Sequence, residues 1–106
     1  MDSEFLSRRE KILQVLRQFK SGITAEDIAR YLVISNVKIV YEDLSRLAKT
    51  IRAKNPNEQL GMTPPLCRAC GFLFTVKKPK KPSKCPQCKS ERIDSPSFSI
   101  LNNSDL

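Results

Sequence analysis

The sequence predicts an α+β fold in which three helices and a small antiparallel sheet carry an inserted segment rich in cysteine. Three observations support this prediction. Apolar residues recur at helical spacing in three stretches before residue 55, and two Cys-x-x-Cys pairs follow between residues 67 and 88. After the second pair, a short stretch alternates polar and apolar residues, which is typical of a strand that needs a partner and a core.

The first helix is expected at residues 8–20. Ser7 and Glu10 have the spacing of a capping box, in which the serine oxygen accepts a hydrogen bond from a free amide of the first turn. Gly22 is a natural stop because glycine readily takes the backbone angles that end a helix. Between the cap and the stop, apolar residues follow helical spacing: Ile12, Leu13, Leu16 and Phe19.

Two further helices are expected at residues 25–32 and from residue 37 to about 54. Thr24 and Asp27 repeat the capping pattern for the first of these, and Asn36 is a good cap for the second. The longer helix ends before Asn55 because the residue preceding Pro56 avoids helical angles. The apolar stripes are Ala25, Ile28, Ala29 and Leu32 for the shorter helix, and Val37, Val40, Leu44, Leu47 and Ile51 for the longer one.

A short second helix joined to a longer third helix by a turn of about four residues is typical of a helix-turn-helix. In that motif the third helix enters the major groove of DNA, whereas the alternative is a polar face that is simply solvated. Glu42 lies on the same face. Its negative charge disfavours close contact with DNA phosphates, or else its carboxylate accepts a hydrogen bond from the amine of a cytosine. The candidate DNA contacts of this helix are Asn36, Lys38, Ser45, Arg46 and Lys49.

The four cysteines form the pattern C-x2-C-x14-C-x2-C, with the members Cys67, Cys70, Cys85 and Cys88. Two such turns facing each other close a tetrahedron of thiolates around one structural Zn²⁺. Gly71 can take the positive φ angle that directs backbone amides at sulfur, whereas Lys89 stands at the equivalent place after the second pair. Two disulfides, a redox dithiol or an iron ion in the same site are the alternatives. Four thiolates leave no open position for a substrate, so a catalytic metal is not expected.

The segment between the cysteine pairs is expected to form a strand and an exposed loop. Residues 71–76 alternate so that Phe72, Phe74 and Val76 share one face. The loop that follows contains five lysines and two prolines in eight residues. Three interpretations of this loop are open. It forms a solvated turn, it acts as a nuclear localisation signal, or its tip contacts nucleic-acid phosphates without recognising the base sequence. The candidate phosphate contacts are Lys77, Lys78, Lys80, Lys81 and Lys84.

Charge is distributed unevenly along the 106 residues, which carry a formal net charge of +8. Residues 61–92 hold 8 basic residues and 1 acidic residue, whereas residues 1–60 hold 11 basic and 8 acidic residues. Such an excess favours a polyanionic partner, with nucleic acid before lipid. No apolar run is long enough to span a bilayer and the start of the chain lacks a secretory signal pattern, so a cytoplasmic location is expected.

Catalysis is not expected. The chain has no histidine, which is the commonest general base, and it shows neither paired carboxylates nor a glycine-rich phosphate loop. No small-molecule substrate is evident.

The strands flanking the cysteine pairs suggest how the parts join. Residues 59–62 can form one strand, and residues 97–101 a second strand that needs a partner. If these two strands are the two sides of the wing of a winged helix, the cysteine segment is inserted within the wing. The expected organisation is a winged-helix core at residues 1–62, a zinc ribbon at residues 63–92, and a returning wing strand with a tail at residues 93–106.

Over residues 24–52 and both cysteine pairs, the chain resembles the small archaeal winged helix-turn-helix proteins that carry a zinc ribbon and are predicted transcriptional regulators. The resemblance implies rubredoxin-like knuckles set in an extended wing and binding to double-stranded DNA. A protein-interaction module that docks on the transcription or RNA-processing machinery is the alternative function.

Overall fold

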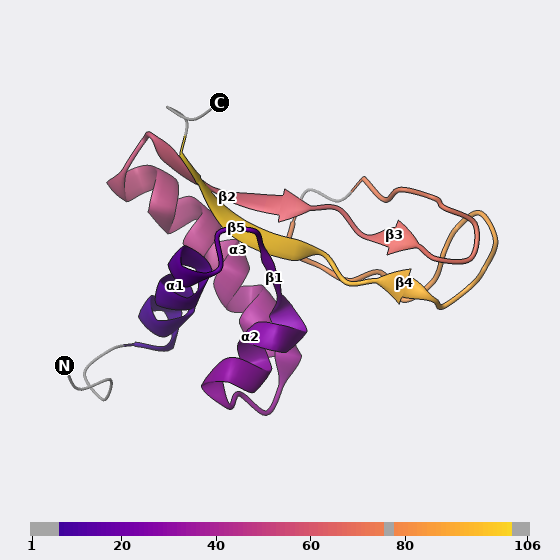
Figure 1. Cartoon of the computed structure of the whole chain (residues 1–106), viewed down its shortest axis with the longest axis horizontal. Coiled ribbons are helices and arrows are strands. Elements are labelled where there is room, and N and C mark those ends of the chain that lie inside the picture. The colour runs from indigo at the N-terminus through magenta and orange to yellow at the C-terminus, as the bar shows by residue number, and fades with distance from the viewer. Residues whose placement is uncertain (1–6, 76–77, 103–106) are drawn as a thin grey trace.

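The computed structural model describes residues 7–75 and 78–102, and three helices form its first part: α1 (Arg8–Gln18), α2 (Ala25–Leu32) and α3 (Val37–Lys54) (Figure 1). The expected bounds of α2 and α3 are confirmed. α1 ends two residues earlier than expected, because Phe19 leaves the helical region with φ −101° and ψ 75°. Its carbonyl then accepts a hydrogen bond from the amide of Gly22 at 3.0 Å, which turns the chain away from the helix axis.

The predicted helix caps are present. Ser7 Oγ accepts from the Glu10 amide at 3.2 Å, and Thr24 Oγ1 accepts from the Asp27 amide at 3.1 Å. Asn36 Oδ1 accepts from the Lys38 amide at 3.0 Å. Each cap satisfies a free donor of a first turn, so the starts of the three helices are fixed by local sequence.

A three-stranded antiparallel sheet covers the helices, with β5 (Ser97–Asn102) in the centre between β1 (Ile23–Thr24) and β2 (Glu58–Thr63). Met62 of β2 and Ile23 of β1 both lie opposite Phe98 of β5. The expected pairing of the segments before and after the cysteines is therefore confirmed. β1, which is only two residues long, was not predicted.

A second, two-stranded sheet lies in the extension at the right of Figure 1, where β3 (Leu66–Cys67) pairs with β4 (Ile93–Asp94). We call residues 64–96 the ribbon. Its apolar cluster is separate from that of the helices and contains Cys67, Phe74, Cys85 and Ile93, with Phe72 packed against it. The helical cluster contains Ile12, Val15, Leu16, Ile23, Ala25, Ile28, Ala29, Val40, Leu44, Leu47, Ile51 and Phe98.

The prediction of a strand at residues 71–76 is wrong for the part that the structure describes, where only Leu73 forms an isolated bridge, to Leu66. Val76, at the end of the predicted strand, lies outside the described residues. Phe74 donates to the carbonyl of Pro65 at 3.1 Å, but proline has no amide with which to return the bond. At the other end, the carbonyl of Cys67 accepts from Gly71 at 2.9 Å. The hydrogen bonds between the segments around Leu66 and Leu73 therefore cannot continue beyond this bridge in either direction, and no strand pair forms.

Two ion pairs fasten α1 to the rest of the fold. Arg17 donates to both carboxylate oxygens of Glu58 in β2, at 2.8 and 3.0 Å. Arg8 makes a bidentate contact with Asp43, whose side chain is buried among the apolar residues of α3. Because a buried carboxylate is costly without a partner, Arg8 compensates the burial of Asp43. None of the helices in the described residues is both long and apolar enough to cross a membrane.

Gly61 of β2 provides a test of the packing between β2 and β5. A Cβ atom at this position would lie 2.6 Å from Cγ of Leu101, which is shorter than the distance that two non-bonded carbon atoms tolerate. We expect Gly61→Ala to destabilise the protein by about 1–3 kcal/mol through overpacking, measured by thermal or denaturant unfolding. Ser99→Ala, at the position paired with Gly61, is the control and should change stability by less than about 0.5 kcal/mol. Equal stabilities of Gly61→Ala and the wild type would contradict this account of the sheet.

Candidate metal centre and basic surface

The cysteine pairs form two similar turns. After the first pair, Gly71 has φ +79° and donates its amide to the carbonyl of Cys67 at 2.9 Å. After the second pair, Lys89 has φ 66° and donates to the carbonyl of Cys85 at the same distance. The expected positive φ at Gly71 is confirmed, and Lys89 adopts the same left-handed backbone although it is not glycine.

These turns bring the four sulfur atoms together, all within 4.8 Å of one another. The Sγ atoms of Cys67 and Cys88 are 3.6 Å apart, and so are those of Cys70 and Cys85. All four cysteines are free, and a disulfide would need about 2.0 Å between sulfurs. Ligands about 2.3 Å from a tetrahedral zinc ion lie about 3.8 Å from one another, so the four thiols fit a single metal ion of that size.

Backbone amides support the sulfur atoms. Burial raises the pKa of the Cys85 thiol, but hydrogen bonds from the amides of Cys88 and Gln87, together with the thiols of Cys70 and Cys88, outweigh the burial and lower the pKa to about 7. The amide of Phe72 likewise lowers the pKa of Cys70, but desolvation and the neighbouring sulfur atoms outweigh it and raise the value to about 12. Because the Cys70 thiol keeps its proton at neutral pH when no ion is bound, metal binding through this sulfur must release a proton.

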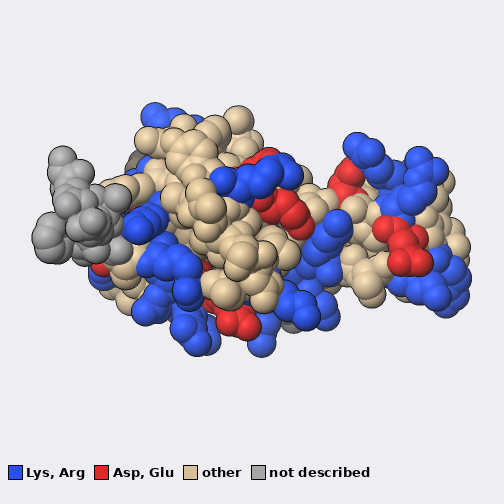
Figure 2. All heavy atoms as spheres, turned by 90° about the horizontal axis from the view of Figure 1, so that it is seen from below, with Lys and Arg blue, Asp and Glu red and all other residues tan. Residues whose placement is uncertain are grey.

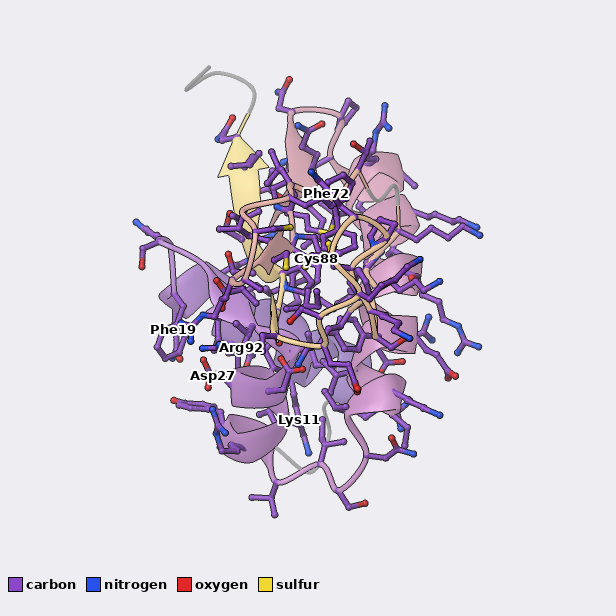
Figure 3. The ribbon with its side chains drawn as sticks, turned by 90° about the vertical axis from the view of Figure 1, so that its right-hand side faces the viewer. Lys11, Phe19, Asp27, Phe72, Cys88 and Arg92 are labelled. Carbon is purple, nitrogen blue, oxygen red and sulfur yellow. The ribbon has the colours of Figure 1, made fainter. Side chains whose placement is uncertain are left out.

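The second sheet and two phenylalanines hold the turns in place. The rings of Phe72 and Phe74 meet edge to face with centroids 5.1 Å apart, and Phe74 is buried beside Cys67 and Cys85. Arg68 donates its amide to the carbonyl of Arg92 at 2.8 Å and forms an ion pair with Asp94 at 2.6 Å. In Figure 3, Phe72 and Cys88 lie close together at the end of the ribbon that faces the viewer. Arg68 is therefore engaged within the ribbon, a role that the sequence did not indicate.

The candidate DNA contacts on α3 differ in their surroundings. Lys38, Arg46 and Lys49 are exposed and make no ion pair with any described residue. Ser45 is half-buried, and the side-chain oxygen of Asn36 is engaged in capping α3. The three cations are therefore the members of this set that are free to meet a phosphate, whereas Asn36 retains only its amide donors.

The candidate contacts on the ribbon loop are exposed lysines: Lys78, Lys80, Lys81 and Lys84. Within residues 78–102 and 7–75 none of them makes an ion pair. Lys77 lies outside the described residues. Figure 2 shows basic side chains gathered at the far end of the ribbon and along the helical part of the face in view, with smaller groups of acidic side chains among them in both places.

The fold and the site define a small α+β protein with a four-cysteine ribbon that can bind a structural metal ion. The family model described as "PF0610-like, N-terminal" matches residues 7–60. The model "PF0610 rubredoxin-like zinc beta-ribbon domain" matches residues 64–103. The chain therefore belongs to the PF0610-like family.

A solved structure agrees with this assignment. The solution NMR structure of protein PF0610 from Pyrococcus furiosus is similar, with a TM-score of 0.72 and 34% sequence identity over 90% of this chain and 89% of that one. No curated protein matches the chain.

The left-handed positions of the two turns can be compared by substitution. Around Gly71, a Cβ atom would meet nothing within 4 Å, so Gly71→Ala tests backbone strain alone. We expect it to lower the stability of the metal-loaded protein by about 1–2 kcal/mol in thermal unfolding. Lys89→Ala is the matched control, because a Cβ is already present there, and it should change stability by less than about 0.5 kcal/mol. A larger loss for Lys89→Ala than for Gly71→Ala would refute this interpretation.

Removal of the metal ion tests whether the site holds the ribbon together. Structural zinc contributes about 10–16 kcal/mol of binding free energy in small zinc-finger peptides, and the ribbon's apolar cluster is small. We expect a chelator to abolish the dispersed amide NMR signals of residues 64–96 and to lower the melting temperature of the whole chain. Cys85→Ser should have a similar effect without chelator. Retention of those signals in metal-free protein would show that the ribbon folds without an ion.

Proposed function

We propose that the protein is a winged helix-turn-helix protein that binds double-stranded DNA and regulates transcription, with its ribbon inserted in the wing. The order of strands in the larger sheet supports this fold. In a winged helix, a short strand between the first two helices and two strands after the third helix form one antiparallel sheet. β1 lies between α1 and α2, and β2 and β5 follow α3, with β5 paired to both.

The arrangement of free cations carries the functional part of the proposal. Lys38, Arg46 and Lys49 project from the exposed side of α3, and the ribbon loop adds four exposed lysines without ion-pair partners in the described chain. Cations of this kind bind phosphates and displace counterions, which gives affinity without reading sequence. α3 would lie in the major groove while the ribbon loop follows the DNA backbone.

The metal ion in this proposal is a single structural Zn²⁺. The donor set of four thiolates is closed, so its role is to hold the ribbon and no substrate position is left. Zinc is favoured over iron by the name of the matching ribbon family. The same closure supports a structural rather than a catalytic role for the metal ion.

A protein-docking function of the ribbon is the second candidate, and the exposed side chains of its bridge favour it. Leu66 is 38% exposed and Leu73 is 59% exposed, and the two are paired. Neighbouring exposed leucines on a basic ribbon suit an apolar and acidic site on the transcription or RNA-processing machinery.

Binding to duplex DNA at several salt concentrations tests the first candidate. If about five cations neutralise phosphates, the logarithm of the affinity should fall with the logarithm of salt concentration with a slope of about −4.5. The double variant Arg46→Ala and Lys49→Ala should reduce the slope by about 2 units, because two phosphate contacts are lost. Leu73→Ser, which alters the ribbon without removing a charge, is the control and should leave the slope unchanged. Absence of binding even at low salt would exclude the DNA-binding proposal and leave the docking function.

A further inference from the structure

A groove between α1 and α2 lies outside the metal centre and outside the proposed DNA contacts. Its volume is about 360 Å³. We call it the α1–α2 groove, and it is lined by Lys11, Gln14, Val15, Gln18, Tyr31, Leu32 and Val33.

Large apolar side chains at this groove are unusually exposed. Val33 is 90% exposed, Tyr31 is 56% exposed, and Phe19 beside Tyr31 is 38% exposed. The rings of Phe19 and Tyr31 meet edge to face with centroids 5.8 Å apart, and Tyr31 Oη donates to Gln18 Oε1 at 3.4 Å. The rings are therefore held in place while their outer surfaces remain open to solvent, which is typical of an interaction surface.

The backbone of Val33 adds a second, independent observation. Val33 has φ 56° and ψ 51° at the C-terminus of α2, and the next amide, of Ile34, donates to the carbonyl of Ala29 at 2.8 Å. This left-handed position usually carries glycine, and a β-branched residue there is rare and strained. The Val33 side chain is almost fully exposed, so apolar burial does not offset this strain. Both the strain and the exposure would be compensated if a partner covered Val33.

The charges at the groove indicate the chemistry of that partner. Lys11 lines the groove. Among residues 7–75 and 78–102, no carboxylate lines it and none pairs with Lys11. Lys20 and Arg30 adjoin Phe19 and Tyr31 in the chain, and the nearby carboxylate of Asp27 is already paired with Arg30. A partner with carboxylates beside an apolar side chain complements this surface.

Two other occupants fit less well. A symmetric dimer through this face would bring together the basic surroundings of two grooves from chains of net charge +8, which is unfavourable. Nucleic acid bases stack on flat aromatic faces, whereas Val33, which is more exposed than Tyr31, is aliphatic.

We propose that the α1–α2 groove binds an acidic segment of a partner protein, with an apolar side chain of that segment covering Val33 and Tyr31 and a carboxylate pairing with Lys11. Figure 3 shows Phe19, at one end of this surface, on the opposite side of the view from α3. None of the candidate DNA contacts on α3 lines the groove, so a partner bound there adds a protein contact to the proposed DNA-binding function.

Chemical-shift mapping on the full, metal-loaded chain tests the proposal with a defined probe. The probe is the capped peptide Glu-Glu-Leu-Leu-Glu-Glu, and the matched control peptide carries lysine in place of each glutamate. We expect the acidic peptide to shift the amides of residues 11–18 and 30–34. The lysine peptide should shift neither range.

Three variants sharpen the test. Val33→Gly should keep or raise the melting temperature, because it removes the left-handed strain, yet lower the affinity for the acidic peptide about tenfold. Lys11→Glu should weaken the acidic peptide at least as much and should create binding of the lysine peptide at the same residues. Ser83→Ala, at an exposed position of the ribbon that belongs to neither candidate binding set, is the control and should change neither result.

Several results would overturn the proposal. One such result is that the acidic peptide shifts the amide signals of the ribbon lysines alone, or binds Val33→Gly as tightly as the wild type. A second is that sedimentation finds a dimer which Val33→Gly converts to a monomer, because a second copy would then cover the groove. A third is that duplex DNA shifts the amides of residues 30–34 more than the acidic peptide does, because the surface would then belong to the DNA interface. Loss of DNA binding in the salt titration, by contrast, would leave this proposal standing.

Discussion

The pairing of β5 with β2 and β1 is the constraint on which the rest of the structure depends. β5 is the central strand of the larger sheet and carries Phe98, the largest fully buried side chain, into the helical core. The chain must pass through the whole ribbon, residues 64–96, before it can form this strand. Closing so long a connection costs entropy, and pairing Cys67 with Ile93 in the second sheet shortens the open part of the loop. A metal ion that holds the ribbon therefore also supports the helical core, although the cysteines and the helices belong to separate apolar clusters.

The features that were predictable from the sequence are those set by neighbouring residues. Caps such as Thr24 and apolar spacing placed the helices, and the two cysteine pairs indicated four sulfur atoms around one point. What failed depends on distant partners. The strand expected at residues 71–76 needed an amide donor that Pro65 lacks. β1 is too short to show periodicity, and it exists because β5 lies beside it. The burial of Asp43 was in principle detectable, since this residue lies on the apolar side of α3, but its partner Arg8 is 35 residues away.

The metal centre also changes the electrostatics of the ribbon. Four thiolates with one divalent ion carry a net charge of −2, so the net charge of residues 61–92 falls from +7 to about +5 when the ion is bound. The sulfur atoms are partly screened by backbone amides, whereas the loop lysines are exposed. The positive charge of the ribbon is therefore concentrated at its loop, and not around the cysteines. The same distribution explains why an acidic peptide must be tested against the ribbon as well as against the α1–α2 groove.

The connection between the ribbon and α3 decides whether their charges act together. Pro65 and Pro96, at the base of the ribbon, are fully buried, and proline restricts the backbone on both sides of the connection. Tyr41 of α3 donates to Glu26 at 3.4 Å, packs edge to face on Phe98, and also meets Ser95 in a side-chain hydrogen bond. The pKa of Tyr41 is raised by its burial, so this hydroxyl remains a donor at neutral pH. If the connection were flexible, the ribbon would strengthen the proposed binding to DNA only by raising the local concentration of its lysines near the duplex. A connection built from buried prolines and a tyrosine that contacts both parts instead fixes the position of the loop lysines relative to α3, which the proposed binding of both to one duplex would require.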